Sequence, residues 1–110
     1  MNINIDGKKY SVSLEDNRAV KELISRLPLE LEMNELNGNE KYYYLDESLP
    51  ASLERVSRIK KGDIMLYGDD CLVIFYESFN TSYSYTRIGR IDNIEDLNLG
   101  SGKISVLFSE

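Results

Sequence analysis

The side chains best suited to chemistry in this sequence are aromatic, and most of them lie between residues 67 and 87. Tyrosine combines a rigid apolar ring with a hydrogen-bonding hydroxyl, which is why it recurs at binding surfaces. An arginine beside such rings adds a donor that can hold a carbonyl oxygen. We predict a binding groove lined by Tyr43, Tyr67, Phe75, Phe79, Tyr83, Tyr85 and Arg87.

Several of these residues also have a purely structural interpretation. Phe75 ends the apolar run Leu72–Phe75, which is typical of a strand buried on both faces. Arg87 fits a solvated cation on the outer side of a strand. The aromatic residues of the Tyr83–Tyr85 segment fit a cap over one end of a barrel. The sequence leaves both interpretations open.

The residues that are missing exclude much chemistry. The sequence has no histidine, which rules out a Ser-His-Asp or Cys-His nucleophile and a histidine general base. Cys71 is the one cysteine, so it cannot form an internal disulfide or complete a zinc site. Gly100-Ser101-Gly102 lacks the third glycine of a dinucleotide-binding loop, and a turn is the simpler interpretation. We expect no metal and no cofactor.

Composition limits the class of protein. A chain of 110 residues fits one domain, 1–110. The formal net charge of −6 opposes binding to nucleic acid or to an anionic membrane. No apolar run is long enough to span a bilayer, and residues 1–10 lack a secretory signal, so we expect a cytoplasmic protein. A monomer or a weak homodimer is the expected state.

Alternation of apolar and polar residues predicts a mainly β fold. The expected strands cover about residues 3–5, 10–14, 29–33, 42–45, 64–67, 71–76, 86–91 and 104–108. Apolar positions at helical spacing predict one α-helix over about residues 17–27, capped by Asp16 or Asn17 and ended by Pro28.

The segment 46–62 has no clear period, and we expect a long connection with one possible helical turn near Leu53–Val56. A second short helical turn is expected at 94–97. About eight strands in a chain of this length favour a closed or nearly closed barrel, because closure removes exposed strand edges.

The order of these elements resembles the cyclophilin-like fold, and in particular the small bacterial cyclophilin-like proteins. The resemblance rests on LNGNEKYYYL (Leu36–Leu45), GDIMLYGDDCLVIFYE (Gly62–Glu77) and SYSYTRIGRID (Ser82–Asp92). It covers essentially the whole chain. It implies a small cyclophilin-like β-barrel, and it raises peptidyl-prolyl isomerase activity as a possible function.

The motifs that carry isomerase activity differ in this sequence. Cyclophilins have a catalytic arginine in an F-H-R-I segment and a glutamine in Q-G-G-D, and the nearest counterpart, Lys41–Leu45, has neither residue. Thr86–Ile91 resembles the V-V-F-G-K-V strand, so Arg87 does not occupy the place of the catalytic arginine. The tryptophan and histidine of the cyclophilin pocket have no counterpart.

Two functions therefore remain as hypotheses, with a third as an alternative. The first is a binding module with an aromatic groove for a proline-containing peptide or a small molecule, without strong catalysis. The second is a divergent peptidyl-prolyl cis-trans isomerase that uses Arg87 or a tyrosine hydroxyl as its donor. The alternative is a structural domain that forms oligomers through an exposed aromatic patch.

Overall fold

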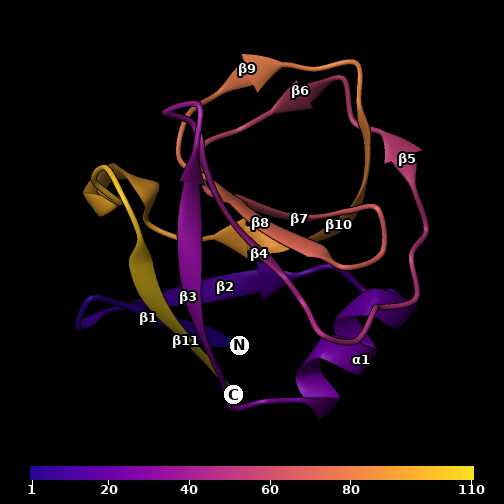
Figure 1. Ribbon diagram of the computed structural model, residues 1–110, viewed down its shortest axis with the longest axis horizontal. Coiled ribbons are helices and arrows are strands. Elements are labelled where there is room, and N and C mark those ends of the chain that lie inside the picture. Colours follow the sequence, from indigo (N-terminus) through magenta and orange to yellow (C-terminus); the bar gives the residue numbers. More distant parts are fainter.

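Eight antiparallel strands close into a barrel in the computed structural model, which describes residues 1–110 (Figure 1). Around the barrel the strands follow the order β2, β1, β11, β3, β4, β8, β7 and β10, and pairing of β10 with β2 closes the circle. Their bounds are β1 Asn2–Ile5, β2 Lys8–Leu14, β3 Leu29–Leu36, β4 Glu40–Tyr44, β7 Asp63–Tyr67, β8 Cys71–Phe75, β10 Ser84–Ile91 and β11 Ile104–Ser109. The predicted fold class is confirmed.

Three short strands and two helices complete the chain. They are α1 (Arg18–Ser25), β5 (Glu54–Arg55), β6 (Arg58–Ile59), β9 (Phe79–Asn80) and the single-turn 3-10 helix η1 (Ile94–Asp96). Neither helix is long and apolar enough to cross a membrane. The turn at 94–97 is confirmed, but the helical turn expected near Leu53–Val56 is wrong. There the chain is extended instead, because β5 pairs with the start of β10.

The helix α1 covers the barrel core. It buries Ala19, Val20 and Leu23 in the largest apolar cluster of the protein. Asn17 caps its first turn, since the side-chain oxygen accepts a hydrogen bond from the Val20 amide at 2.9 Å. The Asn17 side-chain amide also donates to the Arg87 carbonyl oxygen, which ties the start of the helix to β10.

Strand β8 is buried on both faces, as the unbroken apolar run predicts. Leu72 and Ile74 point into the barrel core. Cys71, Val73 and Phe75 belong to a second apolar cluster on the outside of the barrel. The sheet of β4, β8, β7 and β10 therefore separates two cores.

The connection 46–62 and the segment around β9 cover part of this second cluster. Val56 and Ile59 come from the connection, and Phe79 packs beside them. β6 pairs with β9, and the two strands lie together away from the barrel in Figure 1. We call these two segments the arch. The connection is thus ordered, and its apolar residues are what the outer face of β8 packs against.

A buried lysine organises one end of the barrel. Lys41 is fully buried, and its Nζ donates to Glu35 Oε1 at 2.8 Å, to the Gly100 carbonyl at 2.9 Å and to the Gly102 carbonyl at 2.6 Å. The Tyr76 hydroxyl donates to the same Glu35 oxygen. Burial acts to raise the pKa of Glu35, but its hydrogen bonds outweigh burial and bring the pKa below the ordinary value.

Gly89 allows β10 to approach β2 and close the barrel. A Cβ atom at this position would lie 2.5 Å from the Ser13 carbonyl oxygen, which is closer than real side chains come. The pairing of β10 with β7 also shifts register between Arg87 and Gly89. Such an irregularity bends the strand locally, so that β10 can pair with β7 on one side and with β2 on the other.

The two-sided burial of β8 gives a direct test of the barrel core. We expect Leu72→Ala to lower the free energy of unfolding by about 2–5 kcal/mol, because it leaves a cavity in a packed interior. The matched control is Leu107→Ala, at a residue of β11 that is 38% exposed, with an expected change of about 0.5 kcal/mol or less. Urea unfolding of both variants checks this, and equal losses would contradict the assignment of the core.

Candidate functional site

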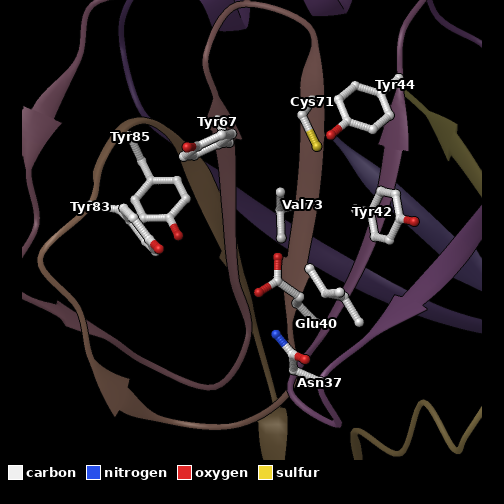
Figure 2. Close-up of a pocket in the computed structure, with 10 residues that line it drawn as sticks. Asn37, Glu40, Tyr42, Tyr44, Tyr67, Cys71, Val73, Tyr83 and Tyr85 are labelled. Carbon is white, nitrogen blue, oxygen red and sulfur yellow. The ribbon is translucent and has the colours of Figure 1, made fainter.

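A cavity of about 370 Å³ opens on the outer face of the barrel, where the arch leaves the second apolar cluster uncovered (Figure 2). Its volume falls within the range of small-molecule sites. The lining residues are Leu36, Asn37, Glu40, Tyr42, Tyr44, Tyr67, Cys71, Val73, Tyr83 and Tyr85. Five of these ten residues are tyrosines.

The floor of the cavity is the outer face of β8. Cys71 and Val73 are both buried, and in the strand register Cys71 lies opposite Tyr44 of β4 and Val73 lies opposite Tyr42. Tyr67 of β7 pairs with Cys71 from the other side. Alternation along each strand therefore brings these side chains to one face of the sheet.

Three tyrosines form one wall. The Tyr67 and Tyr83 rings lie 6.0 Å apart between centroids at an interplanar angle of 79°, and the Tyr67 and Tyr85 rings lie 5.7 Å apart at 58°. The first contact is edge to face and the second is tilted, and both lie within the range of favourable centroid distances for aromatic pairs. Tyr85 is buried, whereas Tyr67 and Tyr83 are exposed at the mouth. The wall thus presents rings in different orientations. Its buried member, Tyr85, belongs to the second apolar cluster.

Two further tyrosines form the opposite wall. Tyr42 and Tyr44 extend from β4 on the other side of Val73 in Figure 2, and their rings meet edge to face at 5.8 Å. The Tyr44 ring is exposed, and its hydroxyl points toward the Cys71 thiol. The cavity is therefore a trough between two groups of aromatic rings.

Glu40 is the one charged side chain in the lining. It is half-buried at the start of β4, and it makes no ion pair and no side-chain hydrogen bond. Burial raises the pKa of the Glu40 carboxyl above its ordinary value, and the nearby Glu35 carboxylate raises it further. The cavity thus contains an unpartnered carboxylate beside aromatic rings.

Two other ionisable groups of the cavity have pKa values well above neutral pH. Burial raises the pKa of Tyr85 to about 12 and that of Cys71 to about 11. The Cys71 side chain, followed by burial, also raises the pKa of Tyr44. A thiol held protonated is a poor nucleophile. The arrangement suits binding far better than covalent chemistry.

A family model described as the cyclophilin-like family matches residues 3–109. The chain belongs to this family. No curated protein and no solved structure was found to match it. Family membership accounts for the barrel, and the contents of the cavity must be interpreted from this chain's own residues.

The structure of this cyclophilin-like protein brings together three of the residues predicted to bind. Tyr67, Tyr83 and Tyr85 all line the cavity. Phe75 instead is fully buried in the second core, where its ring meets Phe79 and Tyr85 edge to face. Phe79 is half-buried within the arch. These two phenylalanines lie beneath the aromatic wall and support it.

Tyr43 and Arg87 lie away from the cavity. Tyr43 packs against the barrel core, on the opposite face of β4 from Tyr42 and Tyr44. Arg87 forms an ion pair with Glu54 of β5 and lines a separate polar depression. No lysine or arginine lines the aromatic cavity.

The sequence interpretation missed the β4 side of the cavity. Tyr42, Tyr44 and Glu40 alternate along one strand, so the period of two already placed them on a common face. Only the pairing with β8 shows that this face points outward to the cavity. The structure contains no group of three or more acidic, cysteine or histidine side chains placed to hold a metal ion.

The pKa of Glu40 predicts an unusual pH dependence of stability. The folded protein holds the Glu40 proton more tightly than the unfolded chain does, so the contribution of Glu40 to stability is greatest in acid and decreases as the pH rises through its folded pKa. We therefore expect Glu40→Gln to stabilise the protein at about pH 7 and to have no effect at about pH 3.

Urea unfolding midpoints at the two pH values measure this effect. Glu32→Gln is the matched control, because Glu32 is an exposed strand carboxylate outside the cavity. It should leave the midpoint nearly unchanged at both pH values. A Glu40→Gln variant less stable than the parent at neutral pH would show that the Glu40 carboxylate has a stabilising partner.

Proposed function

We propose that this cyclophilin-like protein is a binding module whose aromatic cavity takes a small organic ligand or a side chain of an extended peptide. The observation that carries the proposal is the trough of five tyrosines on the floor formed by β8. Tyrosine rings provide apolar contact with little loss of conformational freedom, and their hydroxyls provide hydrogen bonds. A monomeric protein seldom exposes so many large rings in one place without a partner.

The same cavity offers little for strong catalysis. Prolyl isomerisation needs a slot for the proline ring and a strong donor near the amide, since resonance sets a barrier of about 20 kcal/mol. Arg87, the donor with the fixed charge, is held by Glu54 outside the cavity. The tyrosine hydroxyls and the Asn37 side-chain amide are the donors that remain, and these neutral groups are weaker donors than a guanidinium. A divergent isomerase would have to depend on them.

Two-dimensional NMR of the labelled protein tests the proposal. We expect an alanyl-proline peptide or members of a small-fragment panel to shift the amide signals of Tyr67, Val73 and Tyr85 in a saturable manner. Tyr83→Ala should weaken this binding about tenfold, because it removes one wall of the trough. Leu107→Ala, which truncates an exposed apolar residue outside the cavity, is the control and should bind normally.

Exchange spectroscopy on the same peptide distinguishes the alternative function. The proposal predicts cis-trans exchange at the rate of the protein-free control. Acceleration that is lost in Tyr83→Ala would establish an isomerase that uses the aromatic cavity. Shifts confined to residues outside the cavity, or none with any ligand, would contradict the binding module itself.

A further inference from the structure

The charge of the aromatic cavity is entirely negative. Glu40 is its one charged side chain, and no lysine or arginine contributes to the lining. Tyr85 and Cys71 stay protonated well above neutral pH. Any net charge in the cavity is therefore the carboxylate of Glu40, which lacks an ionic partner in the protein.

The aromatic rings of the cavity also favour a positively charged ligand. The face of an aromatic ring carries partial negative charge, and rings at steep angles to one another can surround a cation from several sides. On one wall, the interplanar angle is 79° between Tyr67 and Tyr83 and 58° between Tyr67 and Tyr85. On the opposite wall, the Tyr42 and Tyr44 rings meet at 75°. These are the elements from which recognition sites for organic ammonium ions are built.

We propose that the cavity recognises an organic ammonium group, with the tyrosine rings surrounding its alkyl substituents and the Glu40 carboxylate balancing its charge. This inference rests on the proposed function and specifies the chemistry of its ligand. An unpaired carboxylate beside apolar groups carries a desolvation cost. A bound cation would offset this cost, whereas a bound anion would add electrostatic repulsion to it. A neutral ligand would leave Glu40 without a partner.

The ammonium group has two possible sources with the same chemistry. It could be the head of a small molecule such as choline, or a methylated lysine side chain of a peptide. A cavity of about 370 Å³ accommodates either, since it is open to solvent beside the exposed rings of Tyr44, Tyr67 and Tyr83. The net charge of −6 on the protein favours the approach of a cation in both cases.

A titration with paired probes tests the inference on the intact protein. The probes are choline, its neutral carbon isostere 3,3-dimethylbutan-1-ol, and a short peptide containing trimethyllysine. NMR shifts of Tyr67, Val73 and Tyr85 report binding in the cavity. We expect choline or the peptide to bind at least about tenfold more tightly than the neutral isostere, which matches a cation–ring contribution of ordinary size.

Two variants separate charge recognition from shape. Glu40→Gln removes the carboxylate, and Tyr83→Leu keeps an apolar side chain at the mouth while removing an aromatic face. Each should weaken binding of the cation about tenfold, and by a clearly larger factor than it weakens binding of the neutral isostere. Glu32→Gln, an exposed charge outside the cavity, should alter neither affinity. Unchanged amide spectra away from the cavity establish that the variants are folded.

The outcomes distinguish the two proposals. Equal affinity for choline and for the isostere, with no effect of Glu40→Gln, would overturn cation recognition and leave the binding module intact. Failure of all three probes to shift cavity residues would overturn the ammonium inference, and the proline peptide and fragment panel would then decide the binding function alone. Preference for the free cation over the peptide would identify a small-molecule ligand.

Discussion

Burial of β8 on both of its faces is the constraint on which the rest of the structure depends. Leu72 and Ile74 complete the barrel core, and Cys71, Val73 and Phe75 need a second core outside it. The arch provides that core only in part, covering the Phe75 end of the strand. The uncovered end, at Cys71 and Val73, becomes the floor of the aromatic cavity. The need to bury both faces of β8 therefore accounts for the barrel core and for the position of the aromatic cavity.

The barrel itself was largely predictable because its signals are local. The alternating strands and the helix cap at Asn17 both depend on residues close in sequence. The structure of the connection 46–62 was not predictable in this way. Its short strands β5 and β6 pair with strands distant in sequence, and they carry no apolar–polar period of their own. Its order comes from tertiary contacts, including the donation of the Arg26 guanidinium to the carbonyls of Glu47 and Ser48.

The site was predicted only in part, for a similar reason. The aromatic character of Tyr67, Tyr83 and Tyr85 was sufficient to predict that they line a common groove, and all three line the cavity. The place of Glu40 in the cavity could not be inferred from the sequence, since it depends on which face of β4 points outward and on the absence of any cation in the lining. Arg87 was misleading because the sequence does not reveal its ion pair with Glu54, which lies 33 residues away. The charge inside a cavity depends on which residues the tertiary structure brings together, whereas a cluster of aromatic residues can be read directly from the sequence.

Intermolecular NOEs from the methyl protons of bound choline give the most direct test of the account. The account predicts cross-peaks to the ring protons of Tyr67 and Tyr85 and to the methyl groups of Val73, which together enclose the cavity. It also predicts that Glu40→Gln weakens these cross-peaks while leaving the positions of the ring signals unchanged. Cross-peaks to residues of the polar depression near Arg87 and Arg90 would contradict it, as would the absence of any cavity contact from both choline and the trimethyllysine peptide at saturation.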